Sequence, residues 1–171
     1  MSTLLILGAG GYGRTVADLA SQLGLYERIA FLDDHATGEY VLGKCQDFIL
    51  FSPEDTWIYP GFGDNAVRMN WICQLEQAHY LIPTLVHPRA YVSPTAQLGR
   101  GTVVLPTAVV NTGVKVGKGC ITNIGALIDH DSVLEDGIHL APGAVVKAEN
   151  RIPAGSKIGS GVVIENRQYP L

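Results

Sequence analysis

The sequence predicts an α/β plus β fold, in which a small parallel-sheet domain precedes a parallel β-helix. Three observations support this. A glycine-rich loop, GAGGYG at 8–13, stands between an apolar strand and a helix pattern. An aliphatic residue recurs at every sixth position from Val86 to Ile164, with one exception. The pattern changes near Pro83, so we expect domains at 1–83 and 84–171.

Composition restricts the class of protein. Of the 171 residues, 47% are hydrophobic and 16% are charged, which is typical of a globular chain. Twelve basic and sixteen acidic residues give a net charge of −4 without a basic run, so we expect no nucleic acid or membrane partner. The three cysteines are widely spaced, which favours a reducing compartment over a disulfide framework. No signal segment or membrane-length apolar run is found, so the expected location is cytoplasmic.

The first domain has the order strand, glycine loop, helix, strand, strand, helix. TLLIL at 3–7 is predicted as the first strand, and the helix after it ends at Gly24. RIAFLDD at 28–34 and TWIYPGFG at 56–63 are the next strands, and Asp64 or Asn65 caps the last helix. The predicted apolar positions of the two helices are Val16, Leu19, Ala20 and Leu23, and Met69, Ile72 and Cys73. This order is typical of a small parallel sheet.

The glycine loop has the pattern GxGxxG, formed by Gly8, Gly10 and Gly13. Glycines allow a tight turn and close approach of a ligand, and the following helix N-terminus attracts an anion. Asp33 and Asp34 end the next strand about twenty residues on, where a carboxylate can accept a hydrogen bond from a ribose hydroxyl. NAD is one reading, but a domain of this size corresponds to one mononucleotide-binding half and suits a nucleotide or nucleotide-sugar better. A tight turn without a ligand is the remaining alternative.

The six-residue period predicts a β-helix in which three hexads form one triangular coil. Residues eighteen apart then stack, aliphatic residues point inward, and small residues and glycines form the corners. Ordinary strands of a β-sandwich would not keep this phase over some eighty residues. The inward positions are Val86, Val92, Leu98, Val104, Val110, Val116, Thr122, Ile128, Leu134, Leu140, Val146, Ile152, Ile158 and Ile164.

Two histidines and a carboxylate lie outside these inward positions. His130 is followed by Asp131, and His139 comes nine residues later. An imidazole beside a carboxylate suggests a general base, because the carboxylate orients the ring and stabilises its protonated form. A plain surface histidine is the alternative. Three-histidine zinc ligation is a further one, but His87 lies more than two coils away, so we expect no metal.

The whole chain resembles the bacterial family of nucleotide-sugar N-acetyltransferases and sialic-acid O-acetyltransferases. The matching segments are LGAGGYGR at 7–14, FLDD at 31–34, GFGDNAVR at 61–68, LVHPRA at 85–90, VVNTGVKVGKGCITNIGALIDHDSV at 109–133 and HLAPGA at 139–144. The resemblance implies a Rossmann-like domain followed by a left-handed β-helix, assembled as a homotrimer with an acetyl-CoA cleft between neighbouring helices.

The resemblance also implies roles for individual residues. His130 is the general base that deprotonates a sugar amine or hydroxyl, and Asp131 raises its basicity. The implied acetyl-CoA contacts are Asn123, His139, Gly143 and Gly161. The implied nucleotide-sugar contacts are Gly10, Gly11, Tyr12, Asp33, Asp34 and Gly63.

Two features depart from the family pattern. Tyr12 stands where the family usually has histidine, and roughly two coils and a tail that complete the usual CoA site have no counterpart after APGA. Three functions therefore remain open. The first is acetyl-CoA-dependent N-acetylation of a nucleotide-linked amino sugar in surface-glycan biosynthesis. The others are O-acetylation of a sialic-acid-type sugar and a catalytically lapsed nucleotide-sugar-binding trimer.

Overall fold

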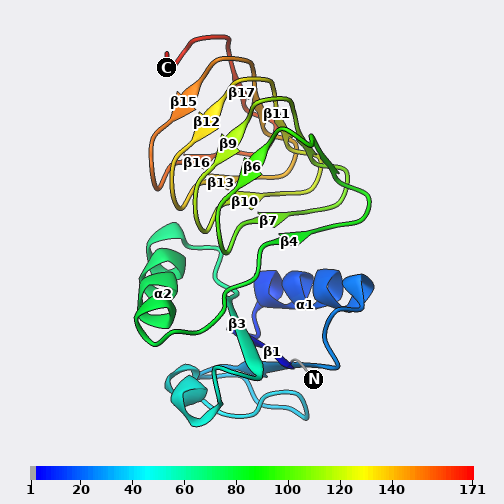
Figure 1. Ribbon diagram of the computed structural model, residues 1–171, viewed down its shortest axis with the longest axis vertical. Helices are drawn as coiled ribbons and strands as arrows, with labels where there is room; N and C mark the ends of the chain where they lie inside the picture. The colour runs from blue at the N-terminus through cyan, green and yellow to red at the C-terminus, as the bar shows by residue number, and fades with distance from the viewer. Residues whose placement is uncertain (1–2) are drawn as a thin grey trace. The chain divides into compact units, whose positions relative to one another are not determined.

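The computed structural model describes residues 3–171 and divides the chain into two compact units, one up to Pro83 and the other Thr84–Leu171. Figure 1 shows helices and a small sheet in the first unit and stacked coils in the second. The predicted fold class, α/β followed by a β-helix, is confirmed. None of the described helices is long and apolar enough to cross a membrane.

The first unit is built on a parallel sheet in the order β2-β1-β3. Its strands are β1 (Thr3–Leu7), β2 (Arg28–Leu32) and β3 (Thr56–Pro60), and its helices are α1 (Gly11–Leu23), α2 (Asn65–Gln77) and the 3-10 helix η1 (Cys45–Leu50). Leu5 of the central strand is in register with Ala30 and Ile58, and all three are buried. Because the three strands are parallel, the loops that follow β1, β2 and β3 lie at the same edge of the sheet.

The helix ends follow the predicted capping residues. Gly24 terminates α1 in the left-handed conformation, and the Asp64 side chain accepts a hydrogen bond from the N–H of Val67 at the start of α2. The predicted apolar stripe of α2 is only partly right, because Ile72 is buried whereas Cys73 is exposed. Arg68, which the pattern did not predict to be apolar, is among the buried residues of α2.

Arg68 is fully buried because its guanidinium hydrogen-bonds nearby backbone and side-chain oxygens. It donates to the carbonyls of Phe62 and Asp64 and to Oδ1 of Asn65. A buried charge is stable only when its donors are satisfied. A hydropathy pattern assigns an arginine to the surface, so the sequence did not predict this position.

The second unit consists of two-residue strands separated by corners. Their bounds are β4 (Leu85–Val86), β5 (Tyr91–Val92), β6 (Gln97–Leu98), β7 (Val103–Val104), β8 (Val109–Val110), β9 (Lys115–Val116), β10 (Ile121–Thr122), β11 (Leu127–Ile128), β12 (Val133–Leu134), β13 (His139–Leu140), β14 (Val145–Val146), β15 (Arg151–Ile152), β16 (Lys157–Ile158) and β17 (Val163–Ile164). The strands form three parallel sheets in which each strand pairs with the third strand before and after it.

We name the three sheets by their first strand. The β4 face contains β4, β7, β10, β13 and β16, the β5 face contains β5, β8, β11, β14 and β17, and the β6 face contains β6, β9, β12 and β15. Partners lie eighteen residues apart, for example Ile121, His139 and Lys157. The predicted three-hexad coil is therefore confirmed.

The interior of the coils contains the predicted aliphatic residues, which form a continuous core. Thr122 occupies one inward position, fully buried between Val104 and Leu140 in the sheet register. In the described structure its hydroxyl has no hydrogen-bond partner. A buried hydroxyl without a partner is destabilising, because it loses its water without gaining a bond.

We expect Thr122→Val to raise the free energy of unfolding by about 1 kcal/mol, because it removes an unsatisfied hydroxyl and fills the same space. Thr102→Val is the matched control. The Thr102 hydroxyl donates to the carbonyl of Gly117 and accepts from the N–H of Cys120, so its removal should destabilise the coil. Thermal unfolding of the two variants measures both effects. A lower stability of Thr122→Val would contradict the expectation.

The corners of the coils have a regular backbone conformation. From Gly101 to Arg167, every sixth described residue has a positive φ, between 54° and 71°. Most of these positions are glycine, which adopts the left-handed region without steric cost. The exceptions are Thr107, Asp131, Glu149 and Arg167. Three of them share one column, at the corner between the β5 and β6 faces.

Candidate active site

The glycine loop packs tightly against the start of α1. A Cβ atom on Gly13 would lie 1.9 Å from the carbonyl oxygen of Gly8, so only glycine fits there. Gly10, Gly11 and Gly63 differ, because a Cβ on any of them would have no atom within 4 Å. Within residues 3–171, no side chain caps the N-terminus of α1. The loop thus combines one structural glycine with open glycines beside a helix N-terminus that favours an anion.

Asp33 and Asp34 make different contacts after β2. Oδ2 of Asp33 accepts from the N–H of Ala9, and Oδ1 accepts from the N–H groups of His35 and Ala36. The backbone N–H of Ala36, followed by those of Ala9 and His35, lowers the pKa of Asp33. Both Asp33 oxygens therefore hold the loops together.

Asp34 is the more exposed carboxylate of the pair. Its Oδ1 accepts from the N–H of Cys45, at the start of η1. Both aspartates line a cavity of about 460 Å³ with residues 35–38 and 41–44. The sequence predicted the two aspartates, but not the segment 35–44 that encloses the cavity, because it contains no motif.

Tyr12 contacts a second tyrosine. Its hydroxyl lies 2.8 Å from that of Tyr59, at the end of β3. Desolvation, and after it the charge of Tyr59, raises the pKa of Tyr12 well above its usual value. The phenol therefore remains protonated at neutral pH and acts as a hydrogen-bonding group.

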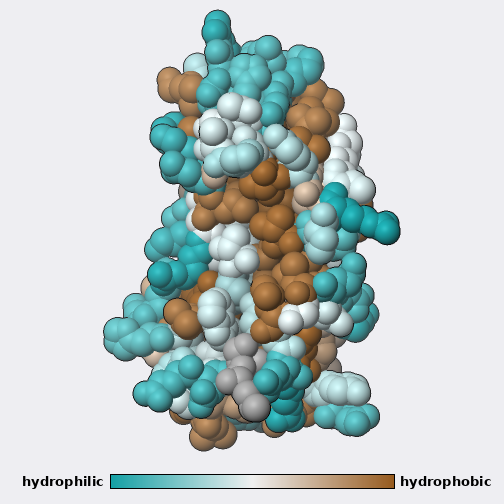
Figure 2. Space-filling view, turned by 45° about the vertical axis from the view of Figure 1, so that its right-hand side comes forward, coloured by the Kyte–Doolittle hydropathy of each residue, from teal (hydrophilic) through white to brown (hydrophobic). Residues whose placement is uncertain are grey.

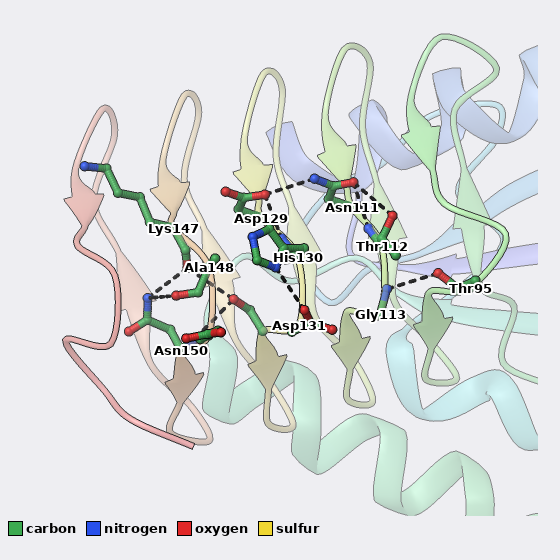
Figure 3. Close-up of polar contacts among 12 residues, drawn as sticks. Thr95, Asn111, Thr112, Gly113, Asp129, His130, Asp131, Lys147, Ala148 and Asn150 are labelled. Atoms are coloured by element: carbon green, nitrogen blue, oxygen red, sulfur yellow. Dashed lines mark hydrogen bonds and ion pairs between the residues drawn. The ribbon is translucent and has the colours of Figure 1, made fainter.

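His130 and Asp131 form a hydrogen-bonded pair at the corner after β11, as Figure 3 shows. Nδ1 of His130 lies 2.9 Å from Oδ2 of Asp131, and both side chains are about half exposed. A carboxylate at Nδ1 requires the ring proton there, which leaves Nε2 to accept a proton. This is the arrangement of an oriented general base.

Neighbouring coils hold this pair in place (Figure 3). The N–H of His130 donates to Oδ1 of Asp129, which also accepts from Nδ2 of Asn111 in the coil below. The N–H of Asp131 donates to the carbonyl of Thr112. The side chain of Asp131 is directed by its left-handed backbone, with φ of 57°.

Negative charge around His130 favours its protonated form. The hydrogen bond that Nδ1 of His130 donates to Asp131 raises the pKa of His130, and this exceeds the opposing effect of desolvation. The charges of Asp129, Asp131 and Glu149 act in the same direction. The pKa of His130 therefore lies above its usual value of 6.5.

The predicted acetyl-CoA contacts gather at a different place. Nε2 of His139, on the β4 face, lies 3.2 Å from Nδ2 of Asn123 one coil below. Gly143 and Gly161 stack at the corner between the β4 and β5 faces, both in the left-handed conformation. They are exposed and leave an open ledge, since a Cβ on Gly143 would come only within 3.9 Å of another atom.

Within one chain, the two groups of predicted site residues are separate. The corner with Gly143 and the corner with His130 lie at opposite edges of the β5 face. One face of extended chain separates them, about 15–20 Å. The structure therefore brings His130 to Asp131 and His139 to Asn123, but it does not bring one pair to the other.

The sequence did not predict Asn111, Asp129, Glu149 or Arg167 near the base. The spacing of eighteen contains the signal, because Asn111 and Asp129 share one column, and Asp131, Glu149 and Arg167 share the next. Among the described residues, no group of three or more side chains could hold a metal ion. His87 is buried, and its Nδ1 accepts from the N–H of Arg89.

Comparison with known proteins gives consistent matches. The family model described as the PglD N-terminal domain matches residues 3–75. The acetyltransferase domain of PglB from Neisseria gonorrhoeae FA1090 is 37% identical, with a TM-score of 0.95, over 98% of this chain and 84% of that one. The chain belongs to the nucleotide-sugar N-acetyltransferase and sialic-acid O-acetyltransferase family. This PglB domain has also been solved in complex with acetyl coenzyme A.

Solved structures with lower sequence identity share the fold. WeeI from Acinetobacter baumannii AYE is 24% identical, with a TM-score of 0.87 over all of this chain and 85% of that one. A mutant of GDP-perosamine N-acetyl transferase from Caulobacter crescentus, in complex with CoA and GDP-perosamine, is 20% identical. It has a TM-score of 0.70 over 95% of this chain and 91% of that one. Comparison with curated protein sequences gives no significant match. The family fold, a Rossmann-like domain followed by a left-handed β-helix, is that of this chain.

Proposed function

We propose that the protein transfers an acetyl group from acetyl-CoA to the amine of a nucleotide-linked amino sugar in bacterial surface-glycan biosynthesis. The oriented His130–Asp131 pair on the outside of the β-helix is the observation that supports this most strongly. The 37% identity to an acetyltransferase domain supports the same reaction class. Residues 1–83 would bind the nucleotide-sugar and 84–171 would carry the acyl transfer, in the cytoplasm.

The chemistry follows from the geometry of His130. Acetyl-CoA supplies the acyl group as a thioester. His130 accepts the proton of the attacking amine at Nε2 as the new C–N bond forms and the C–S bond breaks. Asp131 keeps the proton on Nδ1 and stabilises the imidazolium. The proton then passes from His130 to the departing thiolate, which restores the neutral base.

The proposed acetyl-CoA contacts lie at an open corner of the coils. Gly143 and Gly161 expose backbone without side chains, so a ligand can approach closely. Asn123 and His139 present polar groups beside that ledge. The proposed nucleotide-sugar site is the cavity after β2, with Asp34 as its carboxylate and Gly10, Gly11 and Gly63 as open backbone.

We further propose a homotrimer. The outward residues of the β5 face are all apolar, namely Tyr91, Val109, Leu127, Val145 and Val163. Tyr91 is 53% exposed and Val163 44% exposed. Figure 2 shows apolar surface on the side of the coils that faces the viewer. A second copy covering this face would bury it and would join corners that one chain keeps apart.

The nucleotide site predicts a selective ligand effect. We expect UDP or GDP to raise the melting temperature and NAD to leave it unchanged. Ligand binding stabilises by about 2.7 kcal/mol at a hundredfold excess over Kd. Gly11→Val should keep the melting temperature of the free protein but lose the shift, because its side chain enters the open space before α1. An equal shift with NAD, measured by calorimetry, would indicate the wrong ligand class.

A further inference from the structure

The column of corner residues that contains Asp131 has an unusual composition. Gly113, Asp131, Glu149 and Arg167 follow one another at intervals of eighteen, and all have φ between 54° and 70°. In the column between the β6 and β4 faces the matching positions, Gly101, Gly119, Gly137 and Gly155, are all glycine. A non-glycine residue in this conformation costs roughly 1–2 kcal/mol. The protein therefore keeps two further charged side chains above the catalytic pair at a cost in backbone strain.

Glu149 is connected to His130 through the backbone and to Arg167 through its side chain. The N–H of Glu149 donates to the carbonyl of His130 at 3.2 Å. Its Oε2 is engaged by Nε of Arg167. Asp131, Glu149 and Arg167 also line a cavity of about 340 Å³ together with Pro170 and Leu171. The next coil thus places a carboxylate, neutralised by an arginine, beside the base.

We propose that Glu149 and Arg167 are positioning residues for His130, in which Arg167 binds the Glu149 carboxylate and limits the negative charge that acts on the imidazole. This role rests on the proposed function of His130 as a base. Without Arg167, Glu149 would turn its full charge toward the ring and the cavity. The pKa of His130 would then be higher, so a smaller fraction of the rings would be neutral and able to accept a proton at neutral pH.

The charges around His130 are consistent with this role. Asp129 and Asp131 flank it in its own coil, and Glu149 and Lys147 come from the coil above. Oδ1 of Asp129 accepts from Asn111 and from the N–H of His130, and Lys147 is paired with Glu165. Glu149 is therefore the carboxylate near His130 whose charge is balanced by an ion pair with an arginine, Arg167. Its pKa is lowered, first by the hydrogen bond from Arg167.

The test is the titration of the His130 ring by NMR in the full chain without substrates. Arg167→Gln should raise the pKa of His130, whereas Glu149→Gln should lower it. The double variant should titrate like Glu149→Gln alone, because Arg167 acts only through Glu149. Arg151→Gln is the matched control, since Arg151 makes the same kind of ion pair with Glu135, after β12, and should leave the titration unchanged.

The activity of the variants provides a second readout. On the acid side of the pH profile, Arg167→Gln should lower kcat/KM by roughly two- to fivefold, because a unit charge interacting through water changes a pKa only modestly. A wild-type titration in Arg167→Gln would overturn the proposal, as would a raised pKa that persists in the double variant. If the predicted titrations occur but no amino sugar is acetylated, the proposed function fails, whereas the control of the His130 pKa by Glu149 and Arg167 stands.

Discussion

Replacing His130 with alanine is expected to lower kcat by about a hundredfold to ten-thousandfold, which is the usual contribution of a positioned base. The side chain is half exposed and contributes nothing to the core, so the variant should fold. Steady-state turnover of acetyl-CoA against a panel of UDP- and GDP-linked amino sugars measures the loss. The loss should appear in kcat, because the base acts only when the amine attacks.

Asp131→Asn should cost less and should change the pH dependence. The carboxylate raises the pKa of His130, so wild-type activity falls as the pH drops through a value above 6.5. Without that charge the His130 pKa falls, and the acid limb of the kcat/KM profile should move to lower pH. His139→Ala should act on the KM for acetyl-CoA at least as strongly as on kcat, because its proposed role is to hold the donor.

The control for these variants is His79→Asn. His79 is an exposed histidine of the first unit with a φ of 61°, which asparagine tolerates. Near wild-type turnover of His130→Ala together with complete loss in His139→Ala would reverse the proposed roles. If the wild-type chain acetylates no nucleotide-sugar at all, the nucleotide-sugar-binding trimer replaces the enzyme as the best interpretation.

Most of the fold could be predicted from the sequence because its signals are local and repeated. The six-residue period fixes which residues point inward, and it predicts three faces and a pairing distance of eighteen residues. Gly24 and Asp64 mark helix ends through their own backbone and side-chain chemistry. The failures were Cys73, which is exposed, and Arg68, whose burial depends on carbonyls before and at the start of α2 that no hydropathy pattern contains.

The site was harder to predict because its residues come from different coils. His130 and Asp131 are adjacent in the chain, so a motif could identify the pair. Glu149 and Arg167 reach the same corner only through the stacking of coils, and their charged side chains look like ordinary surface residues in the sequence. Asp33 matched a motif, yet its oxygens hold backbone N–H groups, which no spacing reveals.

Leu127→Asp is expected to dissociate the assembly and to abolish activity. Leu127 is the outward residue of β11, the middle strand of the apolar β5 face. A carboxylate buried there by a second copy would have no partner, and an unpaired buried charge costs several kcal/mol. Light scattering should give three chain masses for the wild type and a single mass of 18.3 kDa for the variant. Val133→Asp is the control, because Val133 is in register with Lys115 and Arg151 on the β6 face.

If acetyl-CoA bound at the Gly143 corner of one chain reacts at His130 of the neighbouring chain, activity must disappear when the trimer dissociates. The Leu127→Asp monomer keeps both His130 and His139, so its inactivity would come from their separation. Co-expression of His130→Ala with His139→Ala should then restore activity, since random mixing leaves about a quarter of the shared sites with both residues intact. An active Leu127→Asp monomer would place the whole site in one chain. A wild type with the mass of one chain would contradict the trimer itself, because the apolar β5 face would then be exposed to water.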